Sequence, residues 1–513
     1  MFELLLVFFR PYKYEMLVFA LLFVIPLVFF TSVKFEKFQS VILCYCIWMM
    51  HRWEGFETVS FFYTRMKGSQ YSISIHHVDL LIPAVFFACV LNKSLYERLK
   101  LPGLGLLIFI IFFMSQFFTG YGAHPDLRIR MTFSIFAHLR MLLFFYFLSE
   151  LLKIDHLRKS FFNVLIFLII FVGINCIKLR YLNGVQKPVG GYFTTYNQQG
   201  YILSSMTGIF LGFLMNYKNI KYSRTLLYLV VSMSGITAIL SQNRGAQMNL
   251  FFTSIGVIGL DFILKLNINK VKTLVTLFIF AIAGLVKSYD TLYDRYFGAG
   301  KNPGGTMTRK AFYVVGWENI KRHKYTGLGT NLYTARGMES ASVRQGILES
   351  QMFDRELDRT SPHEKLEKWV GRHIDWLNNP ERTQFPVEGV IESYWVLCAV
   401  EYGLVAFIPL ILLWLYFYYQ TVRNAVYFRK RNIYYYALST GLFGAFTGCI
   451  VHNATEWCAR QSQAMYFIAA YFALTQLCTF IRKNKTYENE ALDFDFFSRS
   501  DKKASEHVII EPT

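Results

Sequence analysis

The sequence is short of charge, and of acid in particular. Only 17% of its 513 residues are charged, against roughly 25% in a soluble domain. The acids number 34 against 53 Lys and Arg, and 53 − 34 gives a formal net charge of +19. Hydrophobic residues make up 54% of the chain, which excludes a disordered polymer. So much apolar surface also argues against a soluble enzyme of two or three domains, because such an enzyme could not cover it.

The sequence also lacks the patterns that hold metals and nucleotides. It contains no HExxH, no P-loop and no GxGxxG, and no DxD-type acidic pair occurs in an expected outward loop. Its eight cysteines lie mostly inside apolar runs, where a thiol is usually a small buried hydrophobe, so no disulfide framework is implied. We therefore expect no cofactor and no bound metal.

Long apolar runs are what the chain has in abundance. This pattern predicts an all-α polytopic membrane protein, with the lipid bilayer as a partner and about 12–14 transmembrane helices. The candidate spans are 15–33, 38–50, 78–93, 103–120, 131–152, 160–178, 199–216, 225–241, 246–264, 272–287, 391–419, 433–452 and 462–481.

Clusters of Lys and Arg orient these runs. From residue 93 onward every second loop is basic, which places those loops in the cytoplasm. Because the basic residues are spread over short loops, the net charge does not indicate nucleic acid. The start of the chain fits less well, since an odd number of crossings would place Arg10 and Lys13 outside. We suspect a miscounted element before residue 93, with 51–77 as the candidate. The loops expected to face outward are 121–130, 179–198, 242–245, 288–390 and 453–461.

One long polar stretch divides the chain into parts. We expect an N-terminal bundle over 1–287, an external domain over 288–390, a C-terminal bundle over 391–483 and a disordered cytoplasmic tail over 484–513. A structureless loop as long as 288–390 is improbable, so the external domain should be mainly helical.

Arg244 is the most conspicuous single charge. It lies in the segment Leu240–Ala246, between two apolar runs with almost no loop, on the side where positive charge is disfavoured. A guanidinium suits phosphate because it directs two N–H donors onto two oxygens and cannot lose its charge. The alternative is an arginine that only marks the membrane interface.

Acidic residues accompany the entry into the last bundle. Glu392 falls at the outer mouth of an apolar helix, Glu401 lies deeper, and Glu388 stands one helical turn before Glu392. A carboxylate in such a position is costly unless it is paired or takes part in chemistry.

A polar triplet occurs at the last outward turn. His452, Glu456 and Arg460 are spaced four and four, which would place them on one face of a helix. Such a stripe either satisfies its own hydrogen bonds or forms the wall of a site. Asn453 also begins an Asn-Ala-Thr sequence, a weak glycosylation signal.

Several of these segments resemble motifs of the bacterial O-antigen polymerase and ligase superfamily. Arg244-Gly245 resembles its "SRG" element, and Tyr196–Gly200 is similar to the element that opens an earlier helix. The stretch from Arg309 through Trp317 to Thr326–Gly329 resembles the one that ends in the "GxG" turn. The resemblance covers roughly residues 190–480, and the order of the elements adds more than any motif alone.

The segment Glu392–Leu404 is similar to the "HNxxL…ExGxxG" element that closes the large outer loop of this superfamily. Glu392 stands where the ligases have a His, and Ser393 stands where they have an Asn. This departure favours a polymerase over a ligase.

The resemblance implies a glycosyltransferase of the bacterial inner membrane, metal-independent and inverting, with its site facing the periplasm. It would polymerise undecaprenyl-pyrophosphate-linked repeat units of an O-antigen, capsule or exopolysaccharide. Arg244 and Arg309 would stabilise the leaving pyrophosphate, and Glu392 would act as base. The implied partners are the lipid-linked donor and acceptor and a chain-length regulator protein. The residues expected to bind substrate are Arg295, Gln198, Tyr394, His452, Glu456 and Arg460.

Two alternatives remain open at this point. An O-antigen ligase would transfer the glycan to a lipid A core. A transporter of lipid-linked or anionic glycans would explain the helices and the arginines, but it would not need a folded outer domain or an acid beside them.

Overall fold

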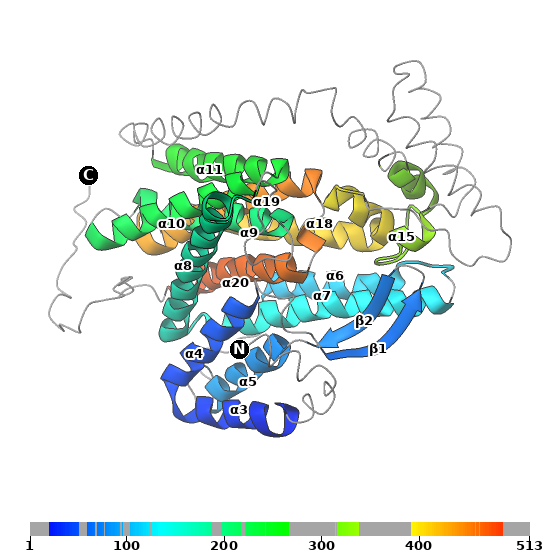
Figure 1. Cartoon of the computed structure of the whole chain (residues 1–513), viewed down its shortest axis with the longest axis horizontal. Helices are drawn as coiled ribbons and strands as arrows, with labels where there is room; N and C mark the ends of the chain where they lie inside the picture. The colour runs from blue at the N-terminus through cyan, green and yellow to red at the C-terminus, as the bar shows by residue number, and fades with distance from the viewer. Residues whose placement is uncertain are drawn as a thin grey trace, which may run out of the picture.

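Helices form along nearly every apolar run of the sequence (Figure 1). In this computed structural model the described residues are 20–50, 59–66, 69–75, 77–92, 95, 103–123, 125–185, 196–216, 221–241, 243–265, 313, 315–337, 391–456, 458–460 and 462–485. The candidate span 272–287, most of the external domain and most of the tail lie outside these residues.

Five described helical segments are long and apolar enough to cross a membrane, and four shorter apolar helices accompany them. The chain is therefore an all-α polytopic membrane protein, which confirms the prediction made from composition and run length. The five long segments are Ser134–Leu151, Asp155–Leu182, Gly245–Lys265, Tyr394–Phe428 and Ala464–Asn484.

The helix boundaries follow the predicted spans closely. The elements of the first half are η2 (Ala20–Val24), α3 (Ile25–Lys34), α4 (Glu36–Met49), α5 (His77–Leu91), α6 (Leu104–Ser115), η4 (Gln116–Phe118), α7 (Pro125–Leu151), α8 (Asp155–Ile177), η5 (Lys178–Leu182), α9 (Tyr196–Asn216), α10 (Lys221–Leu240) and α11 (Arg244–Lys265). Those of the second half are α15 (Tyr333–Arg336), α18 (Tyr394–Phe428), α19 (Ile433–Thr455), η7 (Cys458–Arg460) and α20 (Ser462–Asn484).

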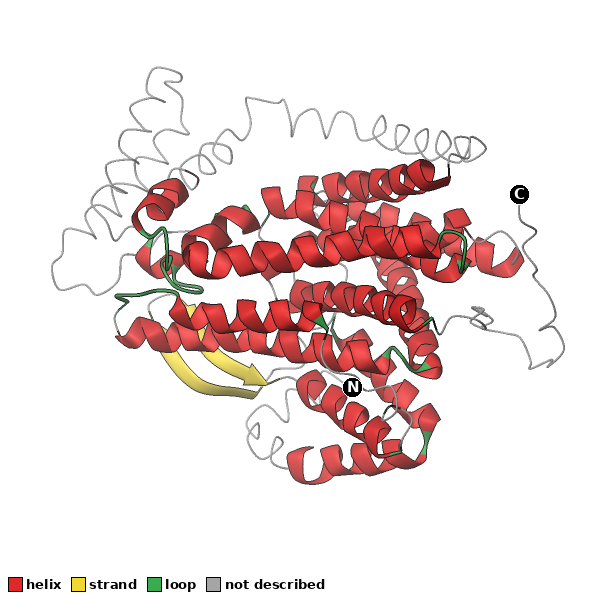
Figure 2. Ribbon diagram, turned by 180° about the vertical axis from the view of Figure 1, so that it is seen from behind, coloured by secondary structure: helices red, strands yellow, loops and turns green. Residues whose placement is uncertain are grey.

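A β-hairpin occupies part of the suspect region 51–77. Strand β1 (Val59–Met66) pairs antiparallel with β2 (Ser69–Ile75), and both lie beside the helical bundle (Figure 2). Because Val59 is opposite Ile75, the hairpin returns the chain to its starting point and adds no crossing. The described part of region 51–77 therefore adds nothing to the predicted number of membrane crossings.

Two helices rich in small residues form the centre of the bundle. α9 is buried along almost its whole length, and α19 packs against α9, α11 and α18. The helices approach closely because glycines face them: a Cβ on Gly212 would lie 2.4 Å from the Ala437 carbonyl oxygen, and one on Gly448 would lie 2.1 Å from Asn249 Oδ1. Small residues at such crossings are typical of helix packing in membranes.

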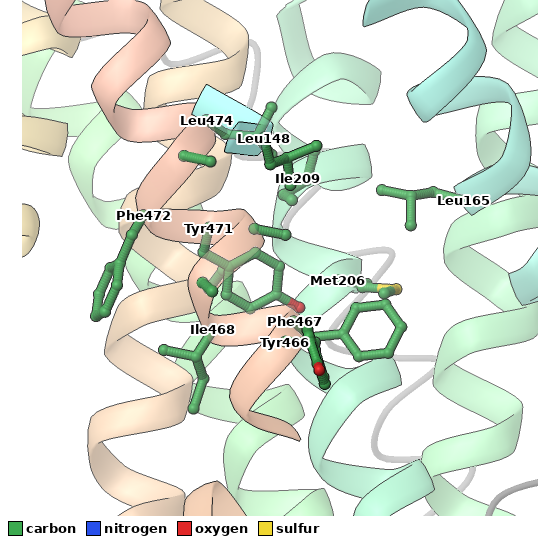
Figure 3. Packing of buried hydrophobic residues seen from close by; sticks show 14 of the residues in the cluster. Leu148, Leu165, Met206, Ile209, Tyr466, Phe467, Ile468, Tyr471, Phe472 and Leu474 are labelled. Atoms are coloured by element: carbon green, nitrogen blue, oxygen red, sulfur yellow. The ribbon is translucent and has the colours of Figure 1, made fainter. Parts of the chain in front are cut away.

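Aromatic side chains of α20 join this centre to the neighbouring helices. Tyr471 is directed toward α9, the helix of Met206 and Ile209, whereas Phe472 points to the other side of α20, where its ring stacks on that of Phe417 with the ring centres 4.3 Å apart (Figure 3). The Tyr471 hydroxyl is 2.8 Å from Ser205 Oγ, so its polar tip is satisfied inside the bundle.

The helix ends that border the predicted basic loops lie at one end of the bundle, which we call the basic end. Lys265 Nζ donates to Asn216 Oδ1 at 2.8 Å and links the ends of α9 and α11, while Lys153 Nζ lies 4.3 Å from the centre of the Phe480 ring. The helix ends that border the predicted outward loops lie at the other end, where Gly120 N donates to the Thr326 carbonyl at 2.9 Å. We call this the predicted outer end.

At the predicted outer end the chain segment 324–329 is hydrogen-bonded to residues 400–405 of α18, and we call these two segments the glycine clasp. Gly329 N donates to the Glu401 carbonyl, and Leu404 N donates to the Lys324 carbonyl, both at 2.9 Å. α18 is broken at Gly403, whose φ of 56° and ψ of −174° belong to a region essentially reserved for glycine.

Glu401 is paired with backbone donors of the segment that follows the clasp. Its carboxylate accepts hydrogen bonds from Asn331 N at 3.0 Å and Tyr333 N at 3.1 Å, at the start of α15. The cost of placing this acid inside the bundle is thus offset by two charge-assisted hydrogen bonds, and we assign it a structural role.

The described part of the external domain is anchored beside the start of α18. Residues 315–322 are helical, and Asn319 Nδ2 donates to the Gly337 carbonyl at 2.7 Å. One turn earlier, a Cβ on Gly316 would lie 2.8 Å from Ile391 Cδ1. The two ends of segment 338–390 are therefore held at the same short helix.

Candidate functional site

Four helix ends meet at the predicted outer end: the starts of α9, α11 and α18 and the end of α19. The side-chain amide of Asn243 donates a hydrogen bond to Oδ1 of Asn197, which lies in the first turn of α9. Its own Oδ1 accepts from Ala246 N at 2.9 Å, which caps the first turn of α11. The cap fixes the start of α11 at Arg244, as the tight turn predicts.

Gly245 brings the α11 start against the end of α19. A Cβ at this residue would lie 2.8 Å from Glu456 Cγ and 3.1 Å from His452 Cε1. Glycine is therefore the residue that allows the start of α11 to lie this close to the end of α19. The backbone of Arg244 is therefore adjacent to both His452 and Glu456, although the Arg244 side chain lies outside the described residues.

The start of α18 contacts the same end of α19. Tyr394 N donates to the Glu456 carbonyl at 3.3 Å, and Ser393 Oγ lies 3.4 Å from the Asn453 carbonyl. Ser393 also caps α18 by accepting from Val396 N. Glu392 directly precedes these contacts, so the chain places it beside α19.

The predicted helical spacing of the polar triplet is wrong. α19 ends at Thr455, and Glu456 has the extended φ of −140° and ψ of 152°, so the four-residue spacing to Arg460 does not describe one face. Arg460 instead closes the 3-10 turn η7, and its side chain lies outside the described residues. Glu392 directly precedes α18, and Glu388, with which it was predicted to share a helical face, lies outside the described residues.

Buried polar side chains are concentrated at this junction. His452 is 0% exposed, its ring centre is 4.8 Å from that of Tyr201, and the Gly245 backbone is its hydrogen-bonding neighbour. The side-chain amide atoms of the equally buried Asn453 make no hydrogen bond within the described part of the chain. Leaving such a group unsatisfied costs about 1–3 kcal/mol, which points to a site that recognises polar groups.

Of the other residues predicted to bind substrate or take part in catalysis, some are described by the structure and some are not. Gln198 and Tyr394 are both 5% exposed and belong to the first turns of α9 and α18. Arg295 and Arg309 lie outside the described residues. The structure thus brings together Tyr394, His452 and Glu456, with Glu392 and the backbone of Arg244 beside them. Gln198 is buried in the first turn of α9, which meets this junction through Asn197.

Sequence reasoning missed the asparagines of the junction. Asn197 and Asn243 join α9 to α11. Asn453 is buried near the end of α19, and its carbonyl oxygen accepts a hydrogen bond from Ser393 Oγ at the start of α18. The signal for Asn243 was its position just before an apolar helix, where asparagine is a preferred N-cap. Because Asn453 is fully buried within α19, the Asn-Ala-Thr sequence does not act as a glycosylation site in the folded chain.

Within the described residues, no group of three or more His, Cys, Asp or Glu side chains is placed so that it could hold a metal ion. No model of a known protein family matches the chain, and a search of curated proteins finds no match either. The helices of the fold define the class as a multi-pass helical membrane protein.

Proposed function

We propose that the protein is a membrane glycosyltransferase that polymerises undecaprenyl-pyrophosphate-linked oligosaccharide repeat units. One observation carries the proposal: the junction joins Arg244-Gly245, Glu392–Tyr394, His452 and Glu456, which are far apart in the sequence. These are the segments that resemble superfamily motifs, together with the polar triplet. The junction lies at the predicted outer end, away from the helix ends that border the basic loops, which supports a site on the outer face of a bacterial inner membrane.

In the proposed reaction an acceptor sugar hydroxyl attacks the anomeric carbon of the donor glycan. The new C–O bond forms as the bond from that carbon to the pyrophosphate oxygen breaks, so the configuration inverts. Glu392 accepts the hydroxyl proton, and the freed undecaprenyl pyrophosphate keeps the electron pair. Arg244 and Arg309 stabilise its developing charge.

The buried side chains of the junction are proposed to position the sugars. Gln198, Tyr394, His452 and Glu456 offer amide, hydroxyl, imidazole and carboxylate groups, and all four side chains are buried near the junction. Arg295 and Arg460 are the other proposed substrate contacts, and a chain-length regulator remains a proposed protein partner.

The product of the purified protein tests this function. Reconstituted with a lipid-linked repeat unit alone, the protein is expected to produce a ladder of lengthened lipid-linked glycans on gels. Glycans that cross the vesicle membrane without lengthening would identify a transporter. Transfer that occurs only when a lipid A core is added would identify a ligase.

Chelation should leave the proposed reaction intact. Pyrophosphate is already a good leaving group, so arginines suffice to stabilise its charge and the rate is expected to change less than about two-fold in EDTA. The measurement is chain extension by purified protein with and without chelator. Complete loss that magnesium or manganese restores would contradict this expectation.

Labelling should place the external segment and the basic end on opposite sides of the membrane. Lys321→Cys, at an exposed position of the helical residues 315–322, is expected to react with a membrane-impermeant maleimide in intact cells. Lys430→Cys, exposed between α18 and α19, is expected to react only after permeabilisation. The eight native cysteines are buried or half-buried, so their background should be low. Labelling of Lys321→Cys only after permeabilisation would reverse the proposed orientation.

A further inference from the structure

A cavity lies at the basic end of the bundle, at the opposite end from the junction. Its volume is about 170 Å³, and α6, α7 and α20 form its walls. Leu106, Phe145 and Phe480 provide an apolar side. Gly103 and Asn484, at the very ends of α6 and α20, provide a polar side.

The charges that line the cavity do not balance. Lys153 Nζ donates to the Glu150 carboxylate, and both side chains are almost fully buried, at 5% and 9% exposure. The opposite charges of this pair cancel. Lys483 is exposed and is therefore the source of one net positive charge on the cavity lining. The start of α6, where Gly103 provides no side-chain cap, contributes backbone N–H groups, but the ends of α7 and α20 lie at the same cavity with the opposite partial charge, so the net positive charge of the lining rests on Lys483.

The exposed face of α6 is apolar from the start of the helix, beside the cavity, to its end. Leu104, Leu107, Ile111 and Met114 recur at helical spacing and are 49–55% exposed. In a membrane protein such a strip faces acyl chains. The cavity with its one net lysine lies at the start of α6, and the apolar strip begins on the same helix at Leu104, so the two together match the charged and apolar parts of an anionic lipid.

We propose that this cavity binds the phosphodiester headgroup of an anionic membrane lipid, with an acyl chain along the exposed strip of α6. The single negative charge of a phosphodiester complements the single uncompensated lysine. Basic pockets between transmembrane helices at a basic membrane face are known to take such headgroups. The site is separate from the proposed glycan chemistry and is independent of it.

Thermal unfolding of the full-length protein in neutral detergent tests the site. Phosphatidylglycerol is expected to raise the apparent unfolding temperature by several degrees by binding the folded state, while phosphatidylcholine and inorganic phosphate are not. In Lys483→Gln the apparent affinity for phosphatidylglycerol should fall about five-fold, since one lysine near an anionic surface contributes about that factor. The matched control is Lys485→Gln, two residues further along and not part of the cavity, which should keep the wild-type affinity.

A second variant adds charge without changing shape. Asn484→Asp replaces a lining amide with a carboxylate and should weaken phosphatidylglycerol binding at least as much as Lys483→Gln. Equal losses in Lys483→Gln and Lys485→Gln would overturn the proposal, because general surface charge would then account for binding. Equal stabilisation by phosphatidylglycerol and phosphatidylcholine would also overturn it, and so would stabilisation by inorganic phosphate alone.

Discussion

Arg244→Lys is expected to slow glycan chain extension by at least about 100-fold, and Arg244→Ala to abolish it. Lysine keeps the positive charge but loses the two-pronged donor geometry that matches a pyrophosphate. Removing one preorganised donor to a developing oxyanion costs about 2.7–4 kcal/mol, or roughly 100- to 1000-fold in rate. Glu392→Gln should likewise slow transfer by about 100-fold if this acid is the base. The measurement is glycan length distribution on gels at matched protein levels.

A control arginine separates chemistry from folding in this experiment. Arg224 is exposed at the start of α10, at the basic end, where its guanidinium lies 5.8 Å from the centre of the Tyr228 ring. Arg224→Lys should therefore give a wild-type ladder. Wild-type ladders from Arg244→Lys and Glu392→Gln together would refute the assignment of these residues, although the protein could still be a polymerase.

Gly403→Ala is expected to lower the free energy of unfolding by about 3 kcal/mol or more. The backbone at this residue already has a φ of 56°, which costs a residue with a side chain about 1–3 kcal/mol. The added Cβ would also lie 2.3 Å from Gly327 N and 2.4 Å from the Tyr325 carbonyl oxygen. Because both contacts are backbone atoms, the glycine clasp must open to admit it. Fluorescence-detected size exclusion after heating measures the loss.

Gly259→Ala in α11 is the matched control for the clasp. A Cβ there meets nothing within 4 Å, and the residue is helical, so alanine should be neutral or slightly stabilising. If Gly403→Ala and Gly259→Ala unfold at the same temperature, the clasp does not contribute to the stability of the fold.

The spans could be predicted from sequence because each depends only on a local run of apolar residues. The predicted 433–452 corresponds to α19 (Ile433–Thr455), and the predicted start of an apolar helix at Arg244 is the observed start of α11. The hairpin also left a local signal, since β1 and β2 are rich in aromatic, β-branched and serine residues on either side of Lys67-Gly68.

The pairing of Glu401 could not be predicted, because its partners are distant in sequence. Its carboxylate accepts from Asn331 N and Tyr333 N across the intervening external segment. The end of α19 was misjudged for a different reason. Glu456 has no Gly or Pro beside it to signal that the helix stops, so the spacing from His452 suggested a continuing helix.

The anchoring of segment 338–390 has a consequence for how freely this segment can vary. Gly337 and Ile391 are both tied to the short helix at residues 316–319, so the segment leaves and re-enters the fold at one place. The chain entropy lost on closing such a loop grows only with the logarithm of its length, about 0.6 kcal/mol for each doubling. Shorter or longer segments could therefore replace this one while the helical bundle kept its stability.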